Sequence, residues 1–368
     1  FDTLIICTAT ALMILISGVW ETSTSIIGIA TKFFTCTLSV MYREKTKEGE
    51  IFGGPMYVIK NGLPKRMLPL AYFFALAGMI GCLPAFQSNQ LIQITGDLAF
   101  SGIENFNIFG GLVLAGITGI VVIGGLKRIA EVATFLVPLM GSIYFGAMLI
   151  ALTLNLDQVF PAFKLILVDA FNGTAIAGGT FFGVLIYGVR RGAFSNEAGM
   201  GTESLVHGVA KVSDPVKQGL VAMTGPIFDT LIICTATALM ILISGVWETS
   251  TSQGVTLTAE AFSMLLGNFG GFILFICVIC FGLSTIFTYS YYGASCSRFL
   301  FGKFGMKFYI YLYIFSIFIY SIVPIDIAIN IADGAFAMMA IPTLVSALWL
   351  APKVMQASKN YFKLIDSY

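Results

Sequence analysis

Long apolar stretches separated by short polar segments make up most of the chain. A helix of about 20 apolar residues is long enough to cross the hydrocarbon core of a bilayer. Such stretches lie at about 2–20, 26–42, 69–94, 108–126, 133–153, 173–189, 219–246, 270–297, 308–323 and 327–351. This pattern predicts an all-α integral membrane protein of about ten transmembrane helices, with both ends of the chain on the same side.

The two longest polar segments each carry a local structural signal. Residues 42–66 combine a charged stretch, a Gly-Gly-Pro turn and a short amphipathic piece, which predicts a segment lying along the membrane interface. Residues 154–173 contain the sequence FKLILV, which favours a short helix at the opposite surface. Neither segment is long enough to form a soluble domain.

A perfect internal repeat interrupts this regular pattern. Residues 1–25, FDTLIICTATALMILISGVWETSTS, recur without change at 228–252. The internal repeats of transporters keep only weak similarity, so a recent duplication or an assembly error is expected. The chain thus divides into a duplicated segment, 1–25, standing in for the first membrane helix, and a transmembrane domain, 26–368. The apolar part of this segment has no Gly before Gly18 and no Pro, which predicts an unbroken helix.

Composition and charge agree with a membrane protein and give its orientation. Hydrophobic residues make up 57% of the chain and charged residues 11%, whereas soluble domains carry about 25% charged residues. Of the 20 Lys and Arg residues, all but Lys32 and Lys164 fall on one side of the predicted spans. Because basic residues collect in cytoplasmic loops, both termini are expected in the cytoplasm. The expected partner is the lipid bilayer, and no nucleic acid is expected.

The residues that usually carry catalysis or bind transition metals are sparse. The seven cysteines are scattered through apolar stretches, and Cys277 and Cys280 lie one helical turn apart without a histidine cluster. We interpret them as small buried side chains rather than as a disulfide framework or a metal site. A nucleophile with its base, an HExxH motif and paired intramembrane aspartates are all missing from the sequence. The protein is therefore not expected to be an enzyme, and no cofactor is expected.

The sixth apolar stretch is rich in glycine. Between 173 and 201 it contains Gly173, Gly178, Gly179, Gly183, Gly188, Gly192, Gly199 and Gly201. Each interior Gly weakens a helix by about 1 kcal/mol relative to Ala, so the stretch could break within the membrane and bind a ligand. The alternative is that these glycines only permit close helix packing. Their spacing leaves both interpretations open.

Several long motifs resemble those of the alanine or glycine:cation symporter family. They are GGPMYVIKNGL at 53–63, GVRRGAFSNEAGMGTESLVHGVAK at 188–211, DPVKQGLVAM at 214–223, FDTLIICTATALMIL at 228–242, STIFTYSYYG at 284–293 and DGAFAMMAIPTLVSAL at 333–348. The resemblance covers residues 26–368. It implies sodium-coupled symport of alanine or glycine across the plasma membrane by alternating access, with sodium as the coupling ion. It also implies a leucine-transporter-type inverted-repeat fold.

The chain departs from the family at its start. The resemblance implies a glycine-rich broken helix ahead of the segment IATKFFTCTLSVMYREK at 29–45, and the duplicated segment stands in its place. The first helix is therefore expected to be aberrant. An alternative hypothesis is a rearranged member that inserts in the membrane but does not transport.

The resemblance suggests Ser284 and Thr285 as sodium ligands, with Thr288 one turn further on. Their hydroxyls are the hard oxygen donors that a small cation needs. The alternative is that these hydroxyls bond back to their own helix, as intramembrane Ser and Thr often do.

The resemblance also suggests substrate contacts for Gln87 and Asn89, which belong to a polar cluster beside Pro84 that is costly to expose to lipid. Thr180, Gly183 and Tyr187 would complete the pocket, where small residues near Gly183 admit only a small side chain. The alternative for the cluster is the polar end of a span.

Two acidic residues are candidates for gating. Glu197 could pair with Arg190 or Arg191 and brace an inner gate, or remain a solvated loop charge. Asp333 could pair with Lys32 or help a gate, or mark a helix end. His207, the single histidine, is interpreted as interfacial rather than as catalytic or metal-bound.

Overall fold

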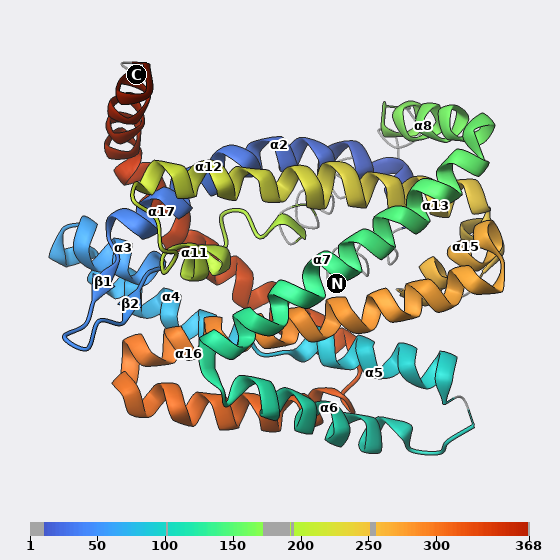
Figure 1. The fold of residues 1–368 in the computed structure, drawn as a ribbon, viewed down its shortest axis with the longest axis horizontal. Helices are drawn as coiled ribbons and strands as arrows, with labels where there is room; N and C mark the ends of the chain where they lie inside the picture. Colours follow the sequence, from blue (N-terminus) through green and yellow to red (C-terminus); the bar gives the residue numbers. More distant parts are fainter. Residues whose placement is uncertain (1–10, 101, 172–191, 193–194, 251–254, 367–368) are drawn as a thin grey trace.

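The computed structural model describes the backbone of residues 11–100, 102–171, 192, 195–250 and 255–366. Nearly all of this is helical, and the helices pack side by side (Figure 1). Among the described residues, five helical segments are long and apolar enough to cross a membrane: Lys65–Asp97, Gly125–Leu154, Pro215–Ser244, Phe269–Tyr320 and Ile325–Ile365. Shorter apolar helices cover Ile26–Met41, Phe106–Val122 and Val255–Leu266. The prediction of a helical protein with several membrane spans is confirmed, while the count of ten stays a prediction.

The helix α2 (Ala11–Met41) runs without interruption through the end of the duplicated segment. The apolar pattern predicted two separate crossings here, at about 2–20 and 26–42. The polar residues at 21–25 include neither Gly nor Pro, and a helix accommodates Glu, Ser and Thr at modest cost. The separation into two crossings is therefore wrong for residues 11–41.

A helical segment from the second half of the chain lies alongside α2 (Figure 1). It consists of α12 (Pro215–Pro226), the π-helix η2 (Ile227–Cys234) and α13 (Thr235–Ser244). Asp214 caps α12, because its carboxylate accepts a hydrogen bond from the Val216 N–H at 2.8 Å. Beyond α13, Gly245 adopts a left-handed conformation and the short α14 (Val246–Thr249) follows.

The charged segment after α2 folds into a hairpin and a short helix. The strands β1 (Glu44–Lys45) and β2 (Ile51–Phe52) pair antiparallel, with Glu44 opposite Phe52. The helix α3 (Pro55–Gly62) and a 3-10 turn, η1 (Lys65–Met67), follow. The first five residues of α3 are buried, because α3 packs against α2, α4 and α17. The helix is thus embedded in the protein on one side, whereas the sequence suggested a segment along the interface.

The segment Lys65–Asp97 is interrupted near its centre. It contains α4 (Leu68–Gly81) and α5 (Ala85–Ala99), separated by Cys82, Leu83 and Pro84. Pro84 has no N–H and disfavours helical conformation in the residue before it, so the helix ends there. The chain restarts as a helix at once, which leaves a short non-helical step within an apolar segment.

Three helices make the next part of the chain: α6 (Phe106–Val122), α7 (Gly125–Leu154) and α8 (Leu156–Phe171). The helix α7 contains Pro138 and yet remains one helix. The helix α8 confirms the short helix expected within 154–173. It folds back at the end of α7 and contacts α2 (Figure 1).

The last part of the chain contains α11 (Thr202–His207), α15 (Val255–Leu266), α16 (Asn268–Tyr320) and α17 (Ile325–Asp366). The backbone of α16 is not helical at Gly302, where φ is 68° and ψ is −157°, so α16 consists of two limbs. The limbs run antiparallel (Figure 1), and the Tyr313 hydroxyl donates a hydrogen bond across them to the Ile286 carbonyl at 2.6 Å. These limbs correspond to the stretches predicted at 270–297 and 308–323.

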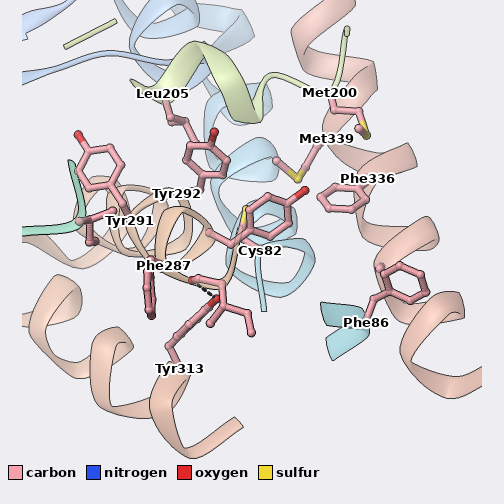
Figure 2. Packing of buried hydrophobic residues seen from close by; sticks show 14 of the residues in the cluster. Cys82, Phe86, Met200, Leu205, Phe287, Tyr291, Tyr292, Tyr313, Phe336 and Met339 are labelled. Carbon is pink, nitrogen blue, oxygen red and sulfur yellow. Dashed lines mark hydrogen bonds between the residues drawn. The ribbon is translucent and has the colours of Figure 1, made fainter. Parts of the chain in front are cut away.

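The α16 helix is the centre of the packing. It contacts α4, α5, α6, α7 and α15. Figure 2 shows aromatic side chains of its two limbs, such as Phe287, Tyr292 and Tyr313, in the buried cluster that also includes Cys82 and Phe336. The step between α4 and α5 therefore borders the main core.

Candidate functional site

The step between α4 and α5 divides the helical hydrogen bonds of the span into two sets. Before it, the Cys82 N–H donates to the Gly78 carbonyl, and after it the Ser88 N–H donates to the Pro84 carbonyl, both at 3.0 Å. The first N–H groups of a helix lack acceptors within that helix, and the N-terminus carries a partial positive charge. Gly81 lies tightly against α17, because a Cβ placed on it would come 3.0 Å from the Ala335 Cβ and 3.3 Å from the Phe336 ring. The step, α17 and the start of α5 are thus adjacent, as Figure 2 shows for Cys82, Phe86 and Phe336.

The predicted polar cluster occupies the first turns of α5. Gln87 is 2% exposed, so its amide lies inside the protein. Asn89 connects α5 to the end of α16. Its Nδ2 donates to the carbonyls of Val323 at 2.6 Å and Tyr320 at 3.3 Å. Gln90 donates to the Gln93 side chain at 2.9 Å. Of the two predicted substrate contacts, Asn89 is held by α16 in this conformation, and Gln87 is the buried amide nearest the step.

The hydroxyls predicted as sodium ligands lie on the first limb of α16. Ser284 and Thr285 both donate to the Phe281 carbonyl, at 2.9 and 3.0 Å. Thr288 donates to the Ser284 carbonyl at 2.9 Å. The hydroxyl protons are therefore directed to their own helix, which was the alternative interpretation. Because each hydroxyl oxygen also has two lone pairs, a donated proton leaves its capacity to coordinate a cation.

Glu197 connects the loop before α11 to α16. It adopts a left-handed conformation, with φ of 53°. Its carboxylate accepts hydrogen bonds at 2.8 Å from the hydroxyls of Tyr289 and Thr202. Tyr289 follows Thr285 by one helical turn, and its ring lies edge-on to Phe336 of α17 at 6.3 Å. The half-buried Glu197 thus connects the loop to the hydroxyl-bearing limb of α16.

Asp333 lies on α17 three residues before Phe336, whose ring contacts Tyr289 of α16. The ion pair suggested between Asp333 and Lys32 is wrong, because Lys32 forms an ion pair with Glu203 of α11. Both side chains of that pair are buried, at 11% and 6% exposure. If Lys32 paired with Asp333 instead, the buried Glu203 carboxylate would lose its counter-charge, which is costly.

Burial shifts the pKa values of Glu203 and His207 in the short helix α11. Burial raises the pKa of the Glu203 carboxyl, and the adjacent Lys32 ammonium group acts in the opposite direction by favouring the charged carboxylate. Burial also lowers the pKa of His207 to about 4. The imidazole of His207 is therefore neutral at physiological pH, and its Nδ1 lies 2.5 Å from the Gln218 Nε2.

A further acidic residue near Ser195 was not predicted as a site residue from the sequence. Asp229 lies in the π-helix η2, and its carboxylate accepts hydrogen bonds from Ser195 at 2.8 Å and from Thr230 at 3.2 Å. π-Helical turns often occur at functional sites. The signal was present in the sequence, because Asp229 is an acid within an apolar stretch, three residues after Pro226.

Other predicted residues lie outside the part of the chain that the structure describes. These are Thr180, Gly183 and Tyr187 of the proposed pocket and the two arginines suggested for Glu197, Arg190 and Arg191. Their places stay predictions. The described residues bring together the step at Pro84, Tyr289 with Glu197, and the α17 turn that carries Asp333. The Ser284 hydroxyl lies 4.0 Å from the Met140 sulfur of α7.

A model of the sodium:alanine symporter family matches residues 19–367 of this chain. The chain belongs to this family. The match starts within the duplicated segment and continues almost to the last residue, so it includes every element described above except residues 11–18 of α2. The sequence resemblance is confirmed by it, and the protein is a multi-pass membrane transport protein.

Named relatives within the sodium:alanine symporter family differ in the amino acid they carry. The sodium/alanine symporter AgcS of Methanococcus maripaludis is 35% identical over 352 residues, which cover 93% of this chain and 76% of that protein. The probable sodium/glutamine symporter GlnT of Bacillus subtilis is 32% identical over 344 residues, covering 93% and 71%. An uncharacterized transporter of Haemophilus influenzae is 34% identical over 358 residues, covering 94% and 76%.

Proposed function

We propose that this protein couples sodium to the uptake of alanine or glycine across the plasma membrane by alternating access, with both termini in the cytoplasm. Family membership supports a symporter, and the similarity to a sodium/alanine symporter supports alanine as the substrate. The observation that carries the proposal is the interrupted span at Cys82–Pro84, beside a buried amide. Discontinuous helices near the midplane bind substrates and ions in many transporters.

In the proposed substrate site, Gln87 contacts the amino acid, together with Asn89, Thr180, Gly183 and Tyr187. An amino acid presents an ammonium group, which needs acceptors, and a carboxylate, which needs donors. The carbonyl and NH2 groups of a glutamine side chain supply one of each. The partial positive charge at the N-terminus of α5 also favours the carboxylate.

For sodium, the proposed ligands are the hydroxyl oxygens of Ser284 and Thr285. Glu197 and Asp333 are proposed to act at the gate on the inner side. Glu197 suits this role because it connects a loop and α16 through the hydroxyl of Tyr289 at 2.8 Å. The proposed fold is the ten-helix leucine-transporter-type inverted repeat.

A second candidate function is a member of the family that inserts but does not transport. The continuity of α2 favours it, because the duplicated segment enters α2 as one unbroken helix from Ala11 to Met41. The family pattern expects a broken helix ahead of this region, so part of an ion and substrate site would be missing.

Uptake of radiolabelled alanine into proteoliposomes separates the two functions. An inward sodium gradient should drive accumulation, and an equal potassium gradient should not. Alanine should also raise the melting temperature of the purified protein in sodium buffer. Uptake that is equal in both gradients would exclude sodium coupling. A stable protein that shows neither uptake nor stabilisation by alanine would establish the non-transporting member.

The substitution Pro84→Ala tests the interrupted span directly. Alanine restores an N–H and favours a continuous helix, so uptake should fall at least tenfold while the protein remains folded. Pro138→Ala in α7 is the matched control, because α7 is one helix despite Pro138. If uptake by Pro84→Ala equals that of the control, the step does not serve transport.

A further inference from the structure

A pocket lies where the hairpin meets the turn of α16, away from the step at Pro84. Its volume is about 370 Å³, within the range of small-molecule sites. The hairpin, α3, the start of α4 and the Gly302 turn all contribute to its wall. The lining residues are Glu44, Lys45, Thr46, Phe52, Tyr57, Lys60, Leu68, Tyr72, Arg298, Phe299, Gly302 and Lys303.

The charge of the lining favours an anion. Four of the lining side chains are basic and one is acidic, and Lys60 pairs with Glu44 within the lining. With Glu48 and Glu50, which pair with Lys303 and Arg298 from outside the lining, the formal charge is +1. Lys45 has no acidic partner among the described residues. Lys303 pairs with Glu48, but both side chains are about 60% exposed, and exposed pairs are readily exchanged for a stronger anionic partner. Lys45 and Lys303 are therefore the two lysines that can bind an anionic ligand.

Aromatic rings form the floor of the pocket and fix the position of Arg298. The guanidinium carbon lies 3.8 Å from the centre of the Phe52 ring, and one of its NH2 groups contacts Glu50 at 2.7 Å. The Phe299 ring packs against Tyr57 at 5.4 Å and Tyr72 at 5.6 Å. Arg298 has five N–H donors, so a stacked and oriented guanidinium can also donate to a phosphate.

An exposed apolar stripe on α4 begins at the rim of the pocket. Tyr72, Leu76 and Ile80 are spaced by four residues on α4 and are 46%, 53% and 47% exposed. They form one apolar stripe about 12 Å long that starts at the pocket, from the rise of 1.5 Å per residue. Phe301 and Phe304, which flank the lining residues Gly302 and Lys303 in the sequence, are 60% and 79% exposed. A molecule that fits this arrangement has an anionic head and an apolar tail.

We propose that this pocket binds the phosphate of an anionic phospholipid headgroup, with an acyl chain along Tyr72, Leu76 and Ile80. Basic pockets at the membrane surface recognise anionic lipids in this way, and tyrosine is common at that depth. The leaflet is the one on the hairpin side, which the distribution of basic residues predicts to be cytoplasmic. The chemistry recognised is a phosphate monoanion, and the apolar stripe selects a lipid as its source.

Native mass spectrometry of the detergent-purified protein, titrated with phosphatidylglycerol or phosphatidylcholine, tests the proposal. The wild type should bind one phosphatidylglycerol in preference to phosphatidylcholine. Lys45→Gln with Lys303→Gln should weaken phosphatidylglycerol binding by about tenfold or more, because two charge-assisted contacts are lost. Lys359→Gln with Lys363→Gln is the matched control, since it removes the same charge from exposed sites on the same predicted side.

Three results would overturn the proposal. The wild type could bind both lipids equally, or the two double variants could lose binding equally, which would indicate a non-specific attraction. Inorganic phosphate could displace the lipid at comparable concentration, which would make a soluble anion the occupant. Both substituted lysines of the pocket are exposed, so the double variant should fold. If the double variant nevertheless fails to fold, the comparison of the two lipids on the wild type still tests the proposal.

Discussion

Hydroxyl groups in α16 illustrate how one residue can satisfy its own helix and still be available to an ion. Ser284 and Thr285 donate to the same carbonyl, that of Phe281, and keep their acceptor lone pairs. Ser290, on the same limb, makes a similar bond to the Phe287 carbonyl at 2.6 Å. A bond to the helix is therefore no argument for or against a role in sodium binding, and only substitution distinguishes these positions.

Ser284→Ala combined with Thr285→Ala should raise the sodium concentration needed for half-maximal alanine uptake by about tenfold or more, since each lost ligand contact weakens binding. Sodium-dependent uptake in proteoliposomes measures this. Ser290→Ala is the control, and its sodium dependence should match the wild type. An unchanged sodium dependence in the double variant would place the ion elsewhere.

His207 predicts a dependence of stability on pH. Burial lowers its pKa to about 4, whereas a histidine in an unfolded chain titrates near 6.5. Between these values the unfolded state binds more protons, so the free energy of unfolding falls as the pH drops from about 6.5 towards 4. Melting temperatures across this range should show the fall, and His207→Gln should flatten it. An equally steep fall in the variant would assign the effect to other groups.

Among the secondary-structure elements, the duplicated segment shows how far tertiary context decides local structure. In the first copy, α2 continues as a helix through Gly18. In the second copy, where Gly245 is the same position of the repeat, the helix α13 ends at Ser244. There, Gly245 has φ of 69°, a value that favours glycine. Identical sequences have identical propensities, so the neighbours of each copy select between the two conformations.

Gly18→Ala and Gly245→Ala should therefore have opposite effects, although both change the same position of the repeat. In α2, alanine should stabilise the protein by up to about 1 kcal/mol, as in any helix interior. At Gly245, alanine should destabilise it by about 1 kcal/mol or more, because a Cβ disfavours the left-handed conformation. The space around Gly245 is open, so the cost arises in the backbone. Melting temperatures that shift in the same direction would contradict the two conformations.

For the whole molecule, hydropathy predicted the helices well because a span must be apolar along most of its length. The helix pair of α16 and the helix α8 were both expected from sequence. The step at Pro84 was not, although Pro84 and its polar neighbours were noted. Single-sequence patterns show where a helix can exist, and they do not show which partner forces it to stop.

The site was less predictable than the fold for a related reason. Glu197 was identified as a candidate, but its partner Tyr289 lies 92 residues away, and the pairing of Lys32 with Glu203 was missed. Contacts between distant segments depend on how the helices pack, which no local pattern encodes. Asn89 was placed in a polar cluster, yet its role at the end of α16 depends on a segment more than 200 residues later.

The pair of Lys32 and Glu203 should dominate the stability of the assembled helices. Glu203→Gln leaves the buried Lys32 without its counter-charge and should cost about 3–5 kcal/mol. Replacing both residues, as Lys32→Met with Glu203→Leu, should recover most of this loss, since apolar pairs of similar volume can replace buried ion pairs. Thermal unfolding in detergent measures both. A double variant as unstable as the single one would mean that the pair does more than neutralise charge.

The same pair has a consequence for how the protein is made. Glu203 follows Lys32 by 171 residues, from 203 − 32 in the sequence, so the ribosome needs roughly 10–30 s at 5–20 residues per second to supply the second charge. During this interval Lys32 lies in an apolar helix without its partner, where an intramembrane charge is costly. The first helices must therefore wait at the insertion machinery, or keep Lys32 in contact with water, until the middle of the chain has been synthesised.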